Sequence, residues 1–328
     1  MKHFFSFIVL TIGLNSIAQT ALTPEKLWEF KRVSGGTVSL DGRFLLFTQT
    51  TYDIAENKGN SDIFIVQLET SKVVQLTNTP FSEVEPQWSA SNKIWFLSAE
   101  SGTMEVWKMN PDATGKEKMS DFGDIALEGF KIAPDESSII TLQSVKMKQT
   151  VNDIYPDLPK ANVRIEDDLM YRHWDHWDDF NKLHLFLHKI EGNKISAQGK
   201  DLNANENFDA VMPPFGGMES VAYFPDSKAI VYATKKMNGK EFAQSTNSSL
   251  YWTSLASDYT EELTSPKEYK GYDTHPGFSL NKDMAWLSMR RDGFEADKND
   301  LMIRHYKSNS DFNLTKDLDV SVSDYAWH

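Results

Sequence analysis

One stretch of the sequence gathers the residue types that bind small charged groups. Between residues 166 and 177, carboxylates stand close to tryptophans, histidines and an arginine. Carboxylates beside aromatic walls suit an ammonium group, which they bind through ion pairing and cation–π contact. The predicted binding residues are Glu166, Asp168, Arg172, His173, Trp174, Asp175 and Trp177.

Two other interpretations of this stretch stay open. In the first, the aromatic rings fasten the segment to the fold and the acids remain solvated, as surface carboxylates normally do. In the second, His173 and His176 bind a metal ion together with Asp175 and Asp178. The two histidines share a face on a helix but point to opposite faces on a strand. Structural zinc sites usually show tighter Cys and His spacing, so neither a metal nor another cofactor is predicted.

The sequence contains no recognisable catalytic nucleophile. It has no cysteine, which excludes a thiolate. A serine on a nucleophile elbow needs Gly-x-Ser-x-Gly, because small residues let the chain turn sharply around it, and this pattern does not occur. The nearest glycine-rich pieces, SGGT at 34–37 and FGGM at 215–218, have no serine between the glycines.

A short recurring pattern predicts the elements that must position the binding residues. It consists of an aromatic or aliphatic residue, a small residue, a turn rich in Asp, Asn, Ser or Gly, and then a strand. Packing between neighbouring repeats is the simplest reason for the large aromatic residue that recurs as Trp88, Tyr223, Phe278 and Trp327. The copies begin at Val38, Trp88, Ile132, Tyr223, Phe278 and Trp327.

Each complete copy is followed by a second alternating strand, and three copies by a third short trace. The second strands begin at Asp62, Glu105, Leu183, Ser249 and Asp300, and the third traces are QLT at 75–77, ELT at 262–264 and NLT at 313–315. Four short strands in a unit of about 45 residues are the period of a propeller blade. The sequence therefore predicts an all-β fold, a β-propeller of about five four-stranded blades plus the start of a sixth, with an incomplete ring.

Additions to this repeat are expected at two places. Residues 146–182 form a long insertion in the third blade, and this insertion holds the acidic and aromatic stretch. Residues 22–33 are expected to form a short helix, because Thr23 suits an N-cap and Pro24 the first helical position. Three acids that precede blades either line the central channel or stay solvated, namely Glu83, Glu85 and Glu219.

The first residues are typical of a secretory signal. Lys2 and His3 precede an apolar run over 4–14, and Ser16 and Ala18 suit a signal peptidase. The predicted organisation is a signal peptide over 1–18, a helix and lead-in over 19–37, and the propeller over 38–328, exported to the periplasm or secreted. The apolar run is too short to span a bilayer, and a net charge of −13 would repel a phosphate backbone. Neither a membrane nor a nucleic acid is a predicted partner.

Several longer segments resemble secreted dipeptidyl and acylaminoacyl peptidases of the prolyl oligopeptidase family. They are LTPEKLWEFKRVSGGTVSLDGRFLLFTQTTYD, DIYPDLPKANVRIEDDLMYRHWDHW followed by LHLFLHKI, and VMPPFGG before YFPDSK. The resemblance covers essentially the whole mature chain. The blade pattern alone is shared by periplasmic TolB-like propellers, whereas the insertion from YPD to MYRHWD is more specific to the peptidases.

The resemblance implies a substrate-gating propeller whose partner is a C-terminal α/β-hydrolase domain absent from this chain. In that family the hydrolase domain carries the Ser, Asp and His triad and cleaves short peptides near the N-terminus. The acidic and aromatic insertion would then recognise the N-terminus of a peptide. Two alternatives are a stand-alone TolB-like binding propeller without catalysis and a nonfunctional remnant, which would expose edge strands and aggregate.

Overall fold

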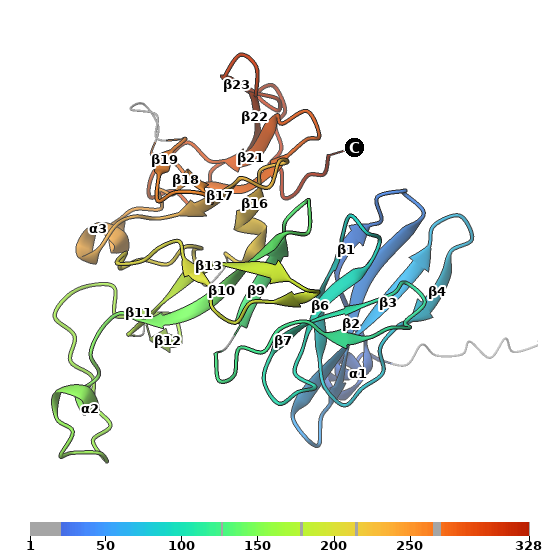
Figure 1. The fold of residues 1–328 in the computed structure, drawn as a ribbon. Helices are drawn as coiled ribbons and strands as arrows, with labels where there is room; N and C mark the ends of the chain where they lie inside the picture. Colours follow the sequence, from blue (N-terminus) through green and yellow to red (C-terminus); the bar gives the residue numbers. More distant parts are fainter. Residues whose placement is uncertain (1–20, 126, 178–179, 214–215, 265–269, 328) are drawn as a thin grey trace, which may run out of the picture.

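The computed structural model describes residues 21–125, 127–177, 180–213, 216–264 and 270–327. The expected signal peptide over 1–18 lies outside these ranges. Within them the chain forms five antiparallel sheets of four or five strands that follow one another in sequence, and one separate two-stranded hairpin (Figure 1). None of the helices in these ranges is long and apolar enough to cross a membrane.

Four of the sheets are four-stranded meanders whose spatial order equals their sequence order, as in propeller blades. The first sheet contains β1 (Arg32–Val38), β2 (Phe44–Asp53), β3 (Lys58–Gln67) and β4 (Lys72–Gln75). The second contains β5 (Glu83–Trp88), β6 (Ile94–Ser98), β7 (Glu105–Met109) and β8 (Glu117–Lys118). The fourth contains β16 (Val221–Tyr223), β17 (Ala229–Thr234), β18 (Ser249–Ser254) and β19 (Thr260–Glu262). The fifth contains β20 (Asp273–Phe278), β21 (Met284–Ser288), β22 (Asp300–His305) and β23 (Ser310–Asn313).

The third sheet departs from the expected four strands. It contains β9 (Leu127–Ile132), β10 (Ser138–Lys146), β13 (Asn181–Glu191), β14 (Lys194–Ile195) and β15 (Lys200–Asp201). Both β14 and β15 pair with β13, so the outermost strand is split in two. The chain between them detours around the His188 ring, which contacts the Ser196 carbonyl through Nδ1 at 2.9 Å. Gly199 lies so close to this ring that a side chain there would collide with it.

The predicted insertion is present between β10 and β13. It contains the one-turn helix α2 (Val151–Ile154) and a hairpin of β11 (Arg172–His173) and β12 (His176–Trp177). In Figure 1 the part around α2 projects away from the sheets.

Apolar side chains fill each interface between successive sheets. Between the first and second sheets, for example, Leu46 and Ile63 pack with Phe96 and Met109. The recurring large residue contributes as predicted at three positions: Trp88, Tyr223 and Phe278 each pack in such an interface. Trp327 does not, because it is 40% exposed and no strand occurs between β23 and residue 327.

The start of a sixth blade is therefore not formed in the described part of the chain. Among the described residues, no strand of the first sheet pairs with one of the fifth, and the ring stays open between them (Figure 1). The incomplete propeller ring predicted from the repeat is confirmed.

The N-terminal helix is shorter than expected. α1 (Pro24–Glu29) has Thr23 as its N-cap, where the side chain accepts a hydrogen bond from the Lys26 amide. The helix ends before residues 32 and 33, which belong to β1 and pair with β2. The first sheet thus begins at Arg32, inside the segment 19–37 expected to lead into the propeller.

In four of the five sheets, a repeated hydrogen bond locks the end of the fourth strand to the third strand. In four sheets a threonine or serine hydroxyl accepts the backbone amide of a residue 14 positions earlier, at 2.8–2.9 Å. The bonds join Ile63 to Thr77, Val106 to Ser120, Leu250 to Thr264 and Leu301 to Thr315. This bond explains why Leu-Thr recurs in the third trace of the sequence repeat.

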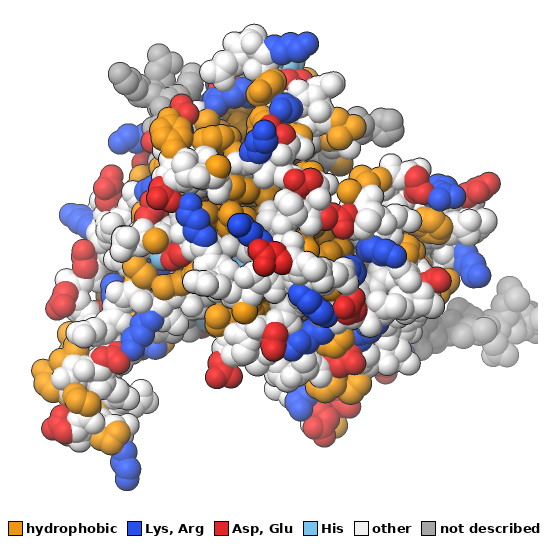
Figure 2. Space-filling model, viewed as in Figure 1, with side chains coloured by type: hydrophobic (Ala, Val, Ile, Leu, Met, Phe, Trp, Pro, Cys, Tyr) orange, Lys and Arg blue, Asp and Glu red, His pale blue; other side chains and the backbone are white. Residues whose placement is uncertain are grey.

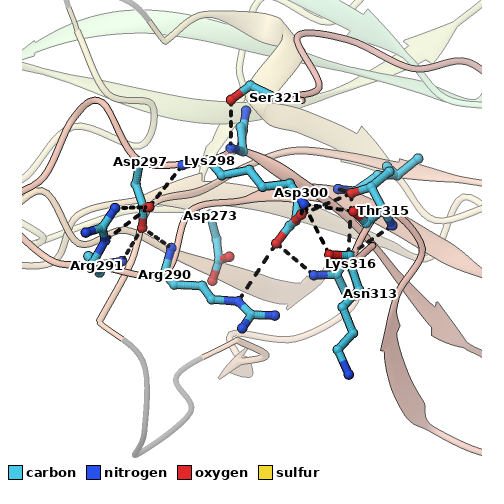
Figure 3. Close-up of polar contacts among 12 residues, drawn as sticks. Asp273, Arg290, Arg291, Asp297, Lys298, Asp300, Asn313, Thr315, Lys316 and Ser321 are labelled. Atoms are coloured by element: carbon cyan, nitrogen blue, oxygen red, sulfur yellow. Dashed lines mark hydrogen bonds and ion pairs between the residues drawn. The ribbon is translucent and has the colours of Figure 1, made fainter. Parts of the chain in front are cut away.

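In the fifth sheet a carboxylate extends this lock into a polar network (Figure 3). Asp300 accepts hydrogen bonds from Asn313 Nδ2 at 2.7 Å and from Thr315 Oγ1 at 3.2 Å. It also pairs with Lys298 at 2.8 Å. Because Lys298 lies at the end of the connection from β21 and Asp300 begins β22, the network fixes the end of that connection to the outer strand.

The connections divide between two sides of the ring. In an antiparallel meander, the connections from second to third strands and from one sheet to the next emerge on the same side. This side carries the insertion, α3 (Gly239–Gln244) between β17 and β18, and the connection over 289–299. The opposite side has only short connections, the longest of which joins residues 109 and 117. One side of the ring is thus elaborated and the other is plain.

Candidate functional site

The innermost strands begin on the elaborated side, and charged residues gather there. β5 contains a bulge between Val84 and Gln87, at which Glu85 adopts a φ of +53°. The bulge directs Glu85 towards Gly129 of the neighbouring β9, where its Oε2 lies close to the glycine. A side chain at 129 would collide with Met218, so a glycine is required for this approach. Within the described structure, Glu85 Oε2 is buried without a hydrogen-bond partner.

Lys131 and Glu219 complete a cluster of mixed charge around this carboxylate. Lys131 lies on β9, and Glu219 lies in the 3₁₀ turn η1 (Met218–Ser220) that leads into the fourth sheet. Burial raises the pKa of Glu85 to about 7, with Lys131 opposing and Glu219 adding to the shift. Burial lowers the pKa of Lys131, opposed by Glu85 and Glu219.

Tyr272, just before β20, belongs to the same cluster. Its pKa is raised by burial and by the charge of Glu219. The residues Glu85, Lys131, Glu219 and Tyr272 therefore come from the second to fifth sheets in turn, and we call them the channel cluster. Carboxylates, an amine and a phenol in one partly buried site can bind ammonium, carboxylate or amide groups.

The sequence predicted only two of the four residues of the channel cluster. Glu85 and Glu219 were predicted to line the channel or stay solvated, and the structure places both in the cluster. Glu83 is instead fully buried and contacts Thr79 and Ser98, so it has a structural role. Lys131 was missed because neither its neighbours nor its spacing distinguishes it from a strand lysine.

The insertion forms a second candidate site. An open hollow with a volume of about 630 Å³ is lined by Arg164, Glu166, Asp167, Asp168, Leu169, Tyr171 and Trp177. Three of the predicted binding residues, Glu166, Asp168 and Trp177, lie in this lining. The Arg164 guanidinium lies over the Trp177 ring, 4.7 Å from its centroid, so two residues of the lining contact each other.

The other four predicted residues lie on the hairpin and do not line the hollow. Arg172 donates from Nε to the Trp174 carbonyl at 2.6 Å, and His173 packs against the Trp174 ring. Asp175 lies 3.4 Å from His176, and both side chains are largely exposed. The hairpin is therefore held mainly by its own contacts.

Asp168 points to the neighbouring blade. Its carboxylate lies against Gly239, the first residue of α3, and leaves no room for a side chain there. Its Oδ1 also accepts the Leu169 amide at 2.8 Å. Asp168 thus brings the insertion into contact with α3, which belongs to the fourth sheet's connection.

The structure gives the two histidines of the metal alternative neither of the arrangements considered for them. His173 and His176 lie neither on one strand nor on a helix, but opposite each other in the β11–β12 pair. Within the ranges that the structure describes, no group of three His, Asp or Glu side chains is close enough to hold a metal ion. Asp178, the fourth proposed ligand, lies outside those ranges.

The chain matches curated proteins of one enzyme type. It is 35% identical over 337 residues to dipeptidyl-peptidase 5 of Porphyromonas gingivalis, covering 99% of this chain and 48% of the relative. It is 34% identical over 278 residues to dipeptidyl-peptidase 5 of Porphyromonas endodontalis, covering 84% of this chain and 40% of the relative. The chain thus spans about half the length of these relatives. No family model matches.

Solved structures agree on the fold. Acylaminoacyl peptidase of Pyrococcus horikoshii superposes with a TM-score of 0.63 at 12% identity, over 91% of this chain and 41% of that one. These matches agree with the resemblance of the sequence to the propeller part of the prolyl oligopeptidase family. A TolB protein of Agrobacterium tumefaciens also superposes with this propeller, with a TM-score of 0.51 at 11% identity, over 86% of this chain and 80% of that one.

Proposed function

We propose that this chain is the substrate-gating propeller of an exported serine exopeptidase of the dipeptidyl peptidase type. The relatives' names support the enzyme type, and their length supports a further part beyond this propeller. A catalytic α/β-hydrolase domain in that part would supply the triad, since residues 1–328 contain no Gly-x-Ser-x-Gly. Export rests on the signal-like residues 1–18.

The observation that carries the proposal is the channel cluster on the elaborated side of the ring. A peptide that is cleaved near its N-terminus presents a free ammonium group and amides within a few ångströms of each other. Glu85 and Glu219 are the acids that would accept the ammonium, because Glu85 Oε2 is buried without a partner in the described structure. Lys131 and Tyr272 would bind the peptide carbonyls.

The hollow in the insertion is a second proposed contact for the peptide. Glu166, Asp168 and Trp177 line it, whereas Arg172, His173, Trp174 and Asp175 form the hairpin beside it. A carboxylate next to an aromatic ring suits the same ammonium group.

Steady-state kinetics of the full-length polypeptide test this proposal. For a dipeptidyl chromogenic substrate with a free N-terminus, Glu219→Gln and Glu85→Gln should raise KM by about 10- to 100-fold, the effect of losing one charge-assisted hydrogen bond. The N-acetylated substrate should show no such change. Asp258→Asn, an exposed acid on the plain side of the ring, is the control and should behave as wild type. Equal losses on both substrates would contradict ammonium recognition.

A stand-alone TolB-like binding propeller is the alternative. One observation favours it: the chain covers 80% of the TolB structure but only 41% of the acylaminoacyl peptidase. The reading frame after residue 328 distinguishes the two functions. About 300 further residues with a Gly-x-Ser-x-Gly elbow support the peptidase, and a stop codon supports the binding protein.

A further inference from the structure

The sequence contains three places where an aspartate or an asparagine directly precedes a glycine. They are Asp41–Gly42, Asn238–Gly239 and Asp292–Gly293. Because glycine has no side chain, its backbone nitrogen meets little hindrance when it turns towards the preceding side chain. An asparagine attacked in this way loses its amide group as ammonia, and this reaction requires that both reacting groups are free of other contacts.

Hydrogen bonds occupy both groups in the two aspartate pairs. Ser39 accepts the Gly42 amide through its carbonyl at 2.9 Å and donates from Oγ to Asp41 at 2.6 Å. Thr246 accepts the Gly293 amide through Oγ1 at 2.8 Å, and its own amide donates to the carboxylate of that pair at 2.8 Å. Both side chains are carboxylates, which are ionised at neutral pH and are therefore poor electrophiles. These two pairs should not react.

The Asn238–Gly239 pair differs in both respects. Asn238 is exposed, and in the described part of the chain neither its side-chain amide nor the Gly239 backbone amide forms a hydrogen bond. Asn238 directly precedes α3 and has an extended backbone, with a φ of −131° and a ψ of 160°. No helical hydrogen bond therefore holds the Gly239 nitrogen away from the side chain. α3 lies at the left margin of the molecule in Figure 1, and this margin shows acidic and basic side chains at the surface in Figure 2.

We propose that Asn238 is a site of spontaneous deamidation, and that the product loosens the contact between α3 and the insertion. The Gly239 nitrogen gives up its proton and attacks Cγ of Asn238, the bond from Cγ to Nδ2 breaks, and ammonia leaves. Water then opens the cyclic imide at either carbonyl. One opening gives aspartate, and the other gives isoaspartate, in which the main chain runs through the former side chain. The whole reaction consumes one water and releases one ammonium ion, without an oxidant or a reductant.

The product places a new negative charge beside an existing one. The Asp168 carboxylate lies against Gly239 and leaves no room for a side chain there. Deamidation creates a second carboxylate on the residue before this glycine, and like charges at short distance repel each other. The isoaspartate form also lengthens the main chain by one atom before Gly239, which displaces the surface that Asp168 contacts. Both products therefore oppose the contact.

Peptide mapping of the full-length polypeptide after incubation tests the site. Asn238 should be converted at least about tenfold faster than Asn162, which corresponds to about 1.4 kcal/mol of activation free energy. Asn162 is the matched internal control, because it is also exposed and without a hydrogen bond in the described structure, but the β-branched Val163 follows it. Conversion should be faster at alkaline pH, since the attacking amide must lose its proton. Conversion of Asn238 no faster than that of Asn162 would overturn the proposal.

Limited trypsin digestion tests the loosened contact. Ion exchange separates the deamidated polypeptide, which carries one more negative charge, from the unmodified one. The deamidated form and Asn238→Asp should both be cleaved within residues 146–182 about two- to fivefold faster than the unmodified form, the size expected for one exposed pair of like charges. Asn238→Gln should keep the unmodified rate after incubation. In an Asp168→Asn background, Asn238→Asp should lose most of its effect.

Two results of the digestion would overturn the effect on the insertion. One is an unchanged cleavage rate in the deamidated form. The other is slower cleavage, which attraction between the new carboxylate and Lys148 would cause, because Lys148 and Asn238 line the same small cavity. Neither experiment uses a peptide substrate, so the outcome is independent of the kinetics of the channel-cluster variants.

Discussion

At the scale of single residues, burial distinguishes the charged groups of the channel cluster, because it shifts the pKa values of Glu85 and Lys131. Glu85 and Glu219 could be predicted as channel acids because they precede blades. Lys131 could not, because its place beside them depends on how adjacent sheets pack. The contact of Asp168 with Gly239 was equally hidden, since it joins residues far apart in sequence across two blades.

The raised pKa of Glu85 makes stability depend on pH. Burial holds this pKa at about 7, above its ordinary value of 4.5. Between these values the folded chain binds a proton that the unfolded chain has released, so stability falls as pH rises from about 4.5 to about 7. Glu85→Gln removes this loss. Its melting temperature relative to wild type should rise over that range and level off above it, as followed by tryptophan fluorescence, and a difference independent of pH would contradict the assignment.

Gly239 should control how firmly the insertion is held. Gly239→Ala adds a side chain that collides with Asp168, at a φ of +56°. Gly42→Ala is a matched control, because Gly42 has a φ of +69° and open space around it. Each variant should lose about 1 kcal/mol from the unfavourable φ, but only Gly239→Ala should speed trypsin cleavage within residues 146–182. Equal cleavage rates would mean that Asp168 does not fasten the insertion.

At the scale of elements, the repeat predicted four sheets well and one incompletely. Strong alternation and Leu-Thr traces identified the strands of the regular blades. The split outer strand of the third sheet was not foreseen, because it depends on the packing of Gly199 against His188. The two-residue strands of the hairpin are likewise too short for any periodic signal.

The threonine lock should be a measurable part of blade stability. Thr315→Val removes the acceptor of the Leu301 amide and should lower the free energy of unfolding by about 1–3 kcal/mol, the cost of an unsatisfied polar group. Thr315→Ser keeps the hydroxyl and should be close to wild type, as Ser120 performs the same role in the second sheet. Urea unfolding of both variants measures the difference, and similar losses would assign the effect to packing rather than to the hydrogen bond.

At the scale of the whole molecule, the layout of the connections between strands, rather than any single motif, determines which side of the ring carries the candidate sites. The insertion, α3 and the channel cluster share one side of the ring, and this side is the one we expect a catalytic domain to cover. The resemblance in sequence predicted the fold, but the side on which each connection lies follows only from the antiparallel order of the strands.

The separation of binding from catalysis is tested most directly by comparing two polypeptides on the same substrate. Residues 1–328 alone should show no turnover of a dipeptidyl chromogenic substrate, because they contain neither a nucleophile elbow nor a cysteine. The full-length polypeptide should hydrolyse it. Turnover by residues 1–328 that survives removal of contaminating proteases, or a full-length polypeptide without activity on free and acetylated substrates, would contradict the account.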